Sequence, residues 1–170
     1  VGKSRAVLEA IKQMDSPHLV IHGKYDQANE GTAYRAVHEA LRMLVKEILG
    51  WSVDKIQRWK QNLISQLGSD VRLIVDIVPE LKTVLSEQDM RITNEKDRTT
   101  SHEACTSSSV SRFLDSFSSP LVFFLDNIQW ADDDSIQFIL SLLKDFRSKQ
   151  VTIILSHRDD CDAPGFTTLM

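Results

Sequence analysis

The chain has few of the residues that build small disulfide-bonded or fibrous proteins. Its 170 residues include two cysteines, six glycines and four prolines. The cysteines, Cys105 and Cys161, lie far apart in polar surroundings, so they form neither a CxxC pair nor a disulfide framework. This usage argues against a disulfide-stapled secreted module and fits a reducing compartment. We therefore expect a cytoplasmic protein.

Long apolar runs and an excess of positive charge are also missing. The longest apolar runs are far shorter than the roughly 20 residues that cross a bilayer, and no signal-peptide pattern opens the chain. The chain has 20 basic and 24 acidic residues, a net charge of −4, and no long basic block. Because nucleic-acid surfaces need clustered Lys and Arg, we expect no membrane and no nucleic acid among its partners. With 42% hydrophobic residues, the chain is long enough for one globular domain with a core.

One stretch, Leu121 to Asp132, organises the rest of the sequence. Five apolar residues run from Leu121 to Leu125 between Pro120 and Asp126, which predicts a strand buried on both faces. Asp126 then stands where this strand leaves the sheet, at the edge where open α/β sheets hold ligands. A carboxylate at that edge can hold Mg²⁺ if a phosphate site lies beside it.

Two further strands are predicted, at His18–His22, closed by Gly23, and at Val151–Leu155. No two strands follow each other directly, so helical crossovers and a parallel sheet are expected, which is the α/β class. Apolar residues at helical spacing predict the connecting helices. The first helices are expected at residues 3–14, at 32–50 with Thr32 as cap, and at 52–68 with Ser52 as cap. Further helices are expected at 73–85, divided at Pro79, and at 110–117. The last helix should begin at a cap among residues 132–135 and end at Phe146.

The polar segments set the expected domain organisation. Residues 86–109 have almost no apolar side chains and end in Thr-Ser-Ser-Ser, which predicts a loop or a disordered insertion. We expect residues 1–160 to form one domain with a helical insertion at about 32–85. Residues 161–170 would then be a tail that leads to a further region.

The first residues supply half of a phosphate site. Gly2, Lys3 and Ser4 open a predicted helix, and in a phosphate loop such a glycine lets the backbone approach the ligand. The lysine reaches the β- and γ-phosphates, the serine hydroxyl binds Mg²⁺, and the helix amino terminus favours negative charge. The tripeptide alone fits an ordinary helix start. Its combination with the strand that ends at Asp126 favours a site for ATP and Mg²⁺.

Several segments together resemble the predicted AAA ATPase domain of STAND proteins, which are signal-transduction P-loop NTPases with origin-recognition-like AAA domains. The resemblance covers roughly residues 1 to 160 and implies a three-layer P-loop NTPase fold. Its most specific part is the Walker B segment. The resembling segments are VGKSRAVLEAI, GKYDQ, AYRAVHEALRMLVKEIL, WKQNL, LIVDIVPEL and FFLDNIQWADDDS.

The resemblance assigns roles to individual residues. Gly2, Lys3 and Ser4 match the end of Walker A and would bind the nucleotide, with Ser4 also a metal ligand. Asp126 matches the Walker B magnesium ligand. Arg158, in LSHRDD, matches the arginine that closes the fourth strand of such domains and would lie near the γ-phosphate. The signature after Walker B is matched by Gln129, Trp130, Ala131 and Asp132.

Two departures from the family pattern affect the expected activity. The GxxxxGK start and its strand should precede Val1, so we expect an amino-terminally truncated domain whose parallel sheet lacks the P-loop strand. Asn127 stands after Asp126, where a second acid is usual. An amide can orient a water molecule but cannot accept its proton, so hydrolysis should be slow or absent. Asn127 and Arg158 are the candidate catalytic residues.

Each candidate residue also has a structural alternative. Asp126 could cap the following turn, and Asn127 could be either a turn residue or a water-positioning group. Trp130 fits packing better than base stacking. Arg158 could pair with neighbouring acids at the surface. The acids at positions 132–134 fit helix caps better than a metal cluster.

The resulting hypothesis is an ATP-binding, Mg²⁺-dependent regulatory switch in a larger signalling protein. Kinase, cyclase or repeat domains in the same chain would be its effectors. The alternative is a degenerate NTPase fold that acts as a non-catalytic scaffold or protein-interaction module. A DNA-binding ATPase would need a basic winged-helix segment, which these residues do not contain, and the net charge of −4 also argues against it.

Overall fold

Three parallel strands form the sheet of the computed structural model, which describes residues 2–14, 18–27, 34–91, 102–145 and 150–158. The strands are β1 (Leu19–Lys24), β2 (Leu121–Asp126) and β3 (Val151–Leu155), in the order β1-β2-β3. All six residues of the central strand β2 are buried. The predicted parallel sheet is confirmed. Gly23, however, does not close the first strand but lies inside it, because its backbone pairs with Leu125 in register.

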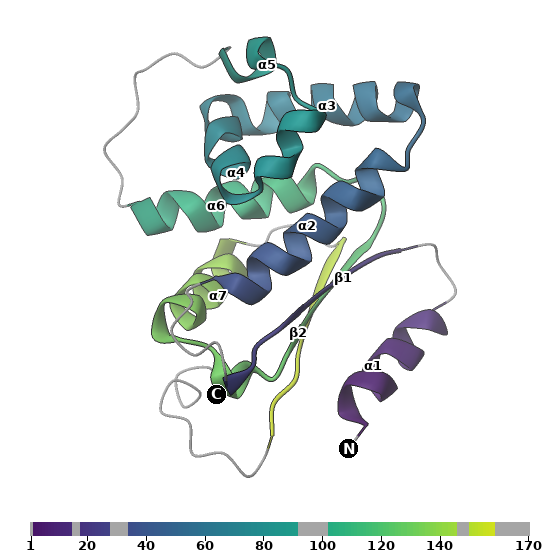
Figure 1. Cartoon of the computed structure of the whole chain (residues 1–170), viewed down its shortest axis with the longest axis vertical. Helices are drawn as coiled ribbons and strands as arrows, with labels where there is room; N and C mark the ends of the chain where they lie inside the picture. Colours follow the sequence, from purple (N-terminus) through teal and green to yellow (C-terminus); the bar gives the residue numbers. More distant parts are fainter. Residues whose placement is uncertain (1, 15–17, 28–33, 92–101, 146–149, 159–170) are drawn as a thin grey trace.

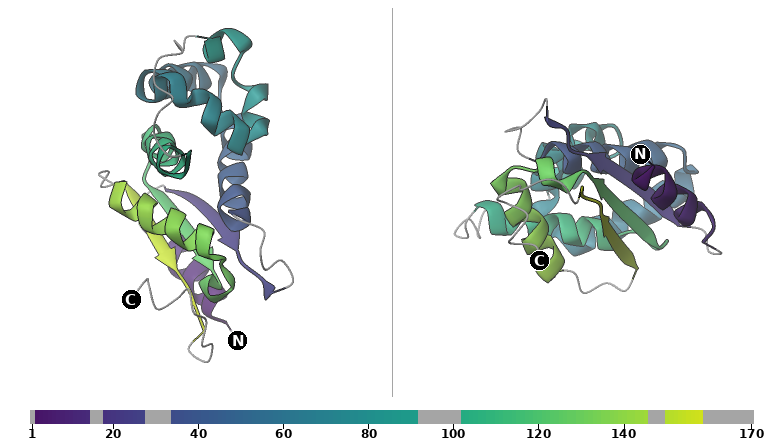
Figure 2. Two further views of the ribbon diagram at one scale, coloured as in Figure 1. Left: turned by 90° about the vertical axis from the view of Figure 1, so that its left-hand side faces the viewer. Right: turned by 90° about the horizontal axis from the view of Figure 1, so that it is seen from below.

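Helices cover both faces of this sheet. Helix α1 (Lys3–Lys12) lies on one face, and α2 (Arg35–Leu49) and α7 (Asp133–Asp145) lie on the other (Figure 1; Figure 2). Side chains alternate between the faces of a strand. Accordingly, Phe123 joins the large core under α2, whereas Phe124 is buried on the face where Ile11 of α1 is also buried. The arrangement is a mixed α/β fold in three layers.

A helical part stands beyond one end of the sheet, between β1 and β2 in sequence (Figure 1). Ser52 caps α3 as predicted, because its hydroxyl accepts the backbone N–H of Lys55 at 3.4 Å. The predicted division at Pro79 is also present. The elements of this part are α3 (Val53–Leu67), the 3-10 turn η2 (Gly68–Asp70), α4 (Val71–Ile77), the 3-10 turn η3 (Pro79–Thr83), α5 (Glu87–Arg91) and α6 (His102–Asp115).

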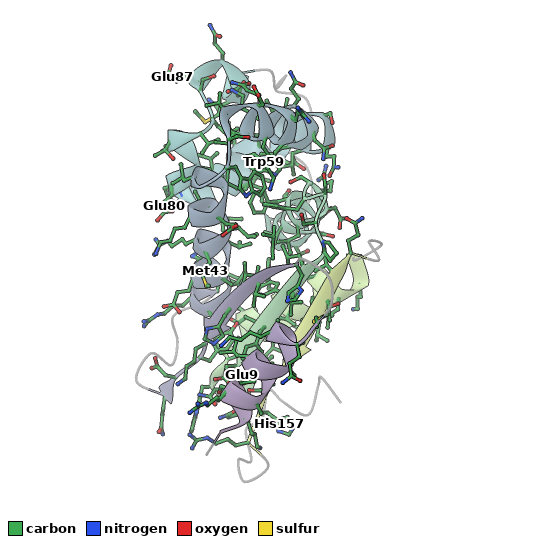
Figure 3. All side chains as sticks on the ribbon, turned by 90° about the vertical axis from the view of Figure 1, so that its right-hand side faces the viewer. Glu9, Met43, Trp59, Glu80, Glu87 and His157 are labelled. Carbon is green, nitrogen blue, oxygen red and sulfur yellow. The ribbon has the colours of Figure 1, made fainter. Side chains whose placement is uncertain are left out.

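Aromatic side chains hold α3 and α6 together. The ring of Trp59 lies 5.7 Å from that of Phe117 and 6.3 Å from that of Phe113, and Trp51 packs edge-on against Trp59. The indole N–H of Trp59 donates to the Ser116 hydroxyl at 3.0 Å. Figure 3 shows Trp59 among these helices, at a distance from the sheet. The helical part therefore has a buried centre of its own, continuous with the main core.

The prediction of a loop or disorder over residues 86–109 is wrong for much of that range. Helix α5 occupies Glu87–Arg91, and α6 begins at His102, well before the expected start at 110. Polarity misled the prediction because buried serines replace apolar residues in α6. Ser107 and Ser109 are 1% and 0% exposed, and the Ser109 hydroxyl donates to Asp70 at 3.2 Å. Residues 92–101 lie outside the described part.

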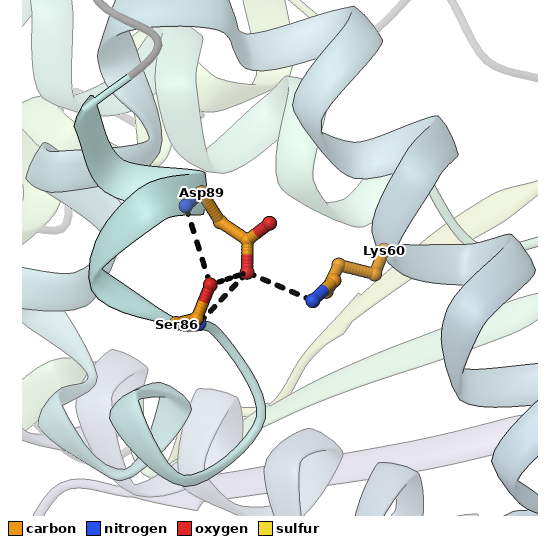
Figure 4. A network of polar contacts seen from close by, with 3 residues as sticks. All are labelled: Lys60, Ser86 and Asp89. Carbon is orange, nitrogen blue, oxygen red and sulfur yellow. Dashed lines mark hydrogen bonds and ion pairs between the residues drawn. The ribbon is translucent and has the colours of Figure 1, made fainter.

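A polar cluster holds the short helix α5 against α3 (Figure 4). The ammonium group of Lys60 lies 2.8 Å from an oxygen of Asp89. The same oxygen accepts the backbone N–H and the hydroxyl of Ser86, at 2.7 and 2.6 Å. Burial alone would raise the pKa of Asp89, but the hydrogen bonds from Lys60 and Ser86 and the charge of Lys60 lower it. The carboxylate therefore stays charged and keeps α5 docked.

Smaller differences concern helix ends and faces. The expected cap Thr32 and the expected helix residue Phe146 lie outside the described residues; α2 begins at Arg35 after Tyr34. Val53, the first residue of α3, is 73% exposed. On α7, Leu142 is buried and the neighbouring Leu143 is exposed. Within the described segments, no helix has the length and apolar character needed to cross a membrane.

Candidate functional site

The amino terminus of α1 meets the carboxyl ends of β2 and β3. The Ser4 hydroxyl donates to Oδ2 of Asp126 at 2.5 Å, although 122 positions separate the two residues. The Lys3 ammonium donates to the backbone carbonyl of His157 at 3.0 Å. Figure 3 shows His157 at the end of the molecule where α1 also begins. The structure thus brings Lys3, Ser4 and Asp126 together, as the sequence hypothesis requires.

Gly2 sets the start of α1. Its φ of 119° lies in a region that L side chains rarely adopt, so glycine suits the position. Its carbonyl accepts the N–H of Ala6 at 2.8 Å, which begins the helical hydrogen-bond series. No acidic residue stands in the first turn of α1. The N–H groups and the dipole of this helix end therefore favour an anion, as at known phosphate sites.

Asp126 is almost fully buried, at 3% exposure, and both of its oxygens accept hydrogen bonds. Oδ2 accepts the Ser4 hydroxyl and Oδ1 accepts the Ser156 hydroxyl. Ser156 in turn accepts the backbone N–H of Asn127 at 3.3 Å. Sequence reasoning missed Ser156. The sequence contained a signal for it: Ser156 directly follows a predicted buried strand, and Asp126 stands at the end of another.

These contacts keep Asp126 ionised. Burial alone would raise its pKa, but hydrogen bonds from Ser156, Ser4 and the Asn127 N–H, with the charge of Lys24, outweigh burial and lower the pKa. A lowered folded-state pKa adds stability above the unfolded value near 4, and this stability is lost as the pH falls through the folded value. At neutral pH the group is a carboxylate, the form that binds cations.

Ser156→Ala is expected to raise the pKa of Asp126, because the variant removes a hydrogen bond that stabilises the charged carboxylate and leaves most of its burial in place. The carboxyl carbon of Asp126, followed by NMR over pH 2 to 7, should titrate at a higher pH. The acid side of the stability curve should shift the same way. Ser65→Ala, at an exposed position on α3, is the control. An unchanged Asp126 titration would show that Ser156 does not stabilise the charge.

Asn127 serves the turn that follows β2. Its backbone is left-handed, with φ 58° and ψ 45°, a conformation that asparagine tolerates well. Its side-chain amide donates to the Tyr25 carbonyl at 3.4 Å, and the Tyr25 N–H donates to the Asp126 carbonyl at 3.0 Å. The amide therefore ties the ends of β1 and β2 together. Of the two alternatives, this geometry favours the turn residue.

Gln129 connects the turn after β2 to Arg158. The side-chain oxygen of Gln129 accepts a hydrogen bond from the backbone N–H of Arg158 at 3.3 Å. Gln129 is only 5% exposed. The amide nitrogen of Gln129 has no hydrogen-bond partner among the described atoms. The side chain of Arg158 is exposed, at the end of the sheet where Asp126 lies. Its neighbouring acids, 159 and 160, lie outside the described residues.

The remaining signature residues have structural roles. Trp130 is partly buried against the core, which agrees with packing rather than base stacking. Asp132 caps α7, because its two oxygens accept the N–H and the hydroxyl of Ser135 at 2.8 and 2.7 Å. Across the described ranges, no cluster of three metal-ligating side chains is found.

One hydroxyl and one carboxylate suit Mg²⁺, which binds few protein groups and completes its shell with water and phosphate oxygens. Ser4 and Asp126 provide that pair. Their hydrogen bond of 2.5 Å shows that the two groups are close enough to hold one ion between them.

Comparisons with known proteins give a family match over most of the chain and one similar protein. The family model described as the AAA ATPase domain matches residues 1–154. The chain is also similar to hybrid signal transduction histidine kinase G of Dictyostelium discoideum, with 29% identity over 144 residues, which is 85% of this chain. It spans 4% of the length of that protein. No solved structure matches significantly. The family match includes Lys3, Ser4 and Asp126 and ends before Arg158.

Proposed function

Because this chain belongs to the AAA ATPase domain family, we propose that it binds ATP and Mg²⁺ where α1 meets the ends of β2 and β3. The observation that carries the proposal is the 2.5 Å hydrogen bond between Ser4 and Asp126. It joins a helix amino terminus to a buried carboxylate at the ligand-binding edge of a parallel sheet. An AAA domain implies nucleotide binding in general; ATP is the nucleotide proposed here.

Each residue of the proposed site would contact a different part of the nucleotide or its metal ion. Gly2 and the first N–H groups of α1 would face the phosphates, and Lys3 would exchange the His157 carbonyl for the β- and γ-phosphates. Ser4 and Asp126 would hold Mg²⁺, with Ser156 keeping the carboxylate oriented. The metal, when bound, would neutralise phosphate charge.

We propose slow or absent hydrolysis. A water-activating base needs to accept a proton, and Asn127 carries an amide that is already bonded to Tyr25. Arg158 would report the γ-phosphate, because its backbone is held by Gln129 at the same edge of the sheet. Slow turnover suits a switch, whose two states need only differ in affinity for the triphosphate.

Lys3→Ala is expected to weaken ATP binding about 100-fold, because it removes the cation that faces the phosphates while the exposed side chain adds nothing to the core. Calorimetry with ATP and Mg²⁺ measures the affinity. It is done on the natural full-length chain, so that the protein includes any residues that precede Val1. Lys12→Ala, at the other end of α1, is the matched control and should bind like the wild type. Equal affinity of the Lys3 and Lys12 variants would overturn the assignment.

The same titration separates the two function classes. A wild-type chain that is folded but binds no ATP would support the non-catalytic scaffold. Binding that depends on Lys3 would support the switch. A magnesium-free titration tests the metal: the affinity should fall without Mg²⁺ if Ser4 and Asp126 hold the ion.

We further propose a place for the domain in a larger signalling protein of the STAND type. Support comes from the similarity to a hybrid histidine kinase of which this chain covers 4%. Effector domains such as a kinase, cyclase or repeat domain would lie in the same chain. Residues 1–160 would form the NTPase domain in the cytoplasm, with residues 32–85 as its helical insertion and 161–170 as a connection.

A further inference from the structure

A groove of about 310 Å³ lies on the opposite face of the sheet from α1. Its lining residues lie on α2, α4, α6 and α7 or, in the case of Tyr34, directly before α2, and none of them belongs to the proposed phosphate site. Its volume is at the lower end of the range for small-molecule pockets. The lining residues are Tyr34, Val37, His38, Leu73, Asp76, Ile77, Val110, Asp134, Gln137, Phe138 and Ser141.

The floor of the groove is apolar. Val37, Val110 and Phe138 are 1%, 0% and 7% exposed, and they come from α2, α6 and α7. Leu73 and Ile77 of α4 are half-buried beside them. A ligand in the groove would therefore bury its body against aliphatic and aromatic carbon.

Aromatic rings form one wall. The rings of Tyr34 and Phe138 meet edge to face at 5.4 Å, and Tyr34 lies 6.5 Å from the His38 ring. Tyr34 is held in place, because its backbone N–H donates to the Ser135 hydroxyl at 2.9 Å. Aromatic faces carry negative potential and attract organic cations.

The rim is acidic. Asp76 and Asp134 are exposed, and no ion pair involves either of them within the described segments. Among the described residues that line the groove there is no lysine or arginine. Burial and the nearby charge of Arg42 lower the pKa of His38, so its ring is neutral at pH 7. Arg42 itself pairs with Glu80 at 3.0 Å.

We propose that this groove binds a small organic cation, an ammonium group on an aromatic or branched aliphatic body. The apolar floor takes the body, and the aromatic wall and two carboxylates take the charge. Phosphates and carboxylates should bind poorly, because the described lining has two acids and no lysine or arginine to attract them. This ligand class differs from the triphosphate proposed for the other face.

A pair of matched probes tests the charge preference. (2-Naphthylmethyl)trimethylammonium and 2-naphthylacetate share one ring system and carry opposite charges. Fluorescence titration and saturation-transfer NMR on the 170-residue chain give both affinities. The cation is expected to bind at least tenfold more tightly. Equal binding, or tighter binding of the acetate, would overturn the proposal.

Variants locate the site. Asp76→Asn with Asp134→Asn should weaken the cation about tenfold, whereas Asp54→Asn with Glu87→Gln removes the same charge away from the groove and should not. Ser141→Trp should block cation binding by filling the groove. If the Ser141→Trp variant does not fold, Gln137→Trp, at an exposed position of the same groove, is used instead. Lys3→Ala should leave cation affinity unchanged, which separates this site from the phosphate site. Cation affinity equal in the groove and control variants would sink the proposal.

Discussion

Trp59→Ala is expected to lower the free energy of unfolding by about 4 kcal/mol, because truncating a buried tryptophan leaves a large cavity. Trp59 is 5% exposed and packs against Phe113, Phe117 and Trp51. The change also removes the indole N–H that Ser116 accepts at 3.0 Å. Urea unfolding followed by circular dichroism gives the free energy.

Two controls interpret that result. Trp59→Phe keeps an aromatic ring at this place and loses the indole hydrogen bond and part of the packing, so it should cost less than half as much. Ile56→Ala, one turn earlier on α3 and half-buried, should cost about 1 kcal/mol. A Trp59→Ala loss no greater than that of Ile56→Ala would contradict the aromatic centre as a main source of stability in the helical part.

Gly23→Ala is expected to destabilise the protein by about 3 kcal/mol, although it adds a single methyl group. A Cβ at Gly23 would lie 2.0 Å from the carbonyl oxygen of Ala36 and 2.6 Å from its carbon. These are backbone atoms of α2, so they cannot turn away as a flexible side chain would. The helix must shift from β1 and disturb the packing of Val37 and Ala40, which are fully buried.

Gly50→Ala is the matched control for this close approach. Its Cβ would meet the nearest atom, the Glu47 carbonyl, at 3.3 Å, and its φ of −82° suits any residue. The expected change is within about 0.5 kcal/mol. Chemical unfolding of both variants measures the difference. Similar stabilities would mean that α2 and β1 separate easily, contrary to the contact that the structure shows.

Local signals predicted most of the regular structure. The run Leu121–Leu125 predicted a buried strand, because so many apolar residues need burial on both faces. Ser52 and Pro79 marked helix boundaries through a cap and a fixed backbone angle, which act within a few residues. The same reasoning failed on α6. This helix packs against α3, α4 and α7, so its serines are buried, and no local rule reports which neighbours a helix will have.

The candidate site was likewise predicted in part from local signals and in part only from the fold. Gly2, Lys3, Ser4 and Asp126 were identified from residue types that suit phosphate and Mg²⁺. Their adjacency came only with the fold, since parallel strands bring distant segments to one edge. The position of Ser156 after a predicted strand could be read from the sequence, but its contact with Asp126 depends on the pairing of β3 with β2.

The sequence by itself determined the class of fold, the helix and strand boundaries with strong local signals, and the residue types on which the proposed phosphate site depends. Periodicity and capping are short-range effects, so they can be read without a structure. Tertiary packing decided the length of α6, the close approach at Gly23 and the organic-cation groove. Each of these depends on which surfaces face each other, and that choice belongs to the whole core rather than to any single segment.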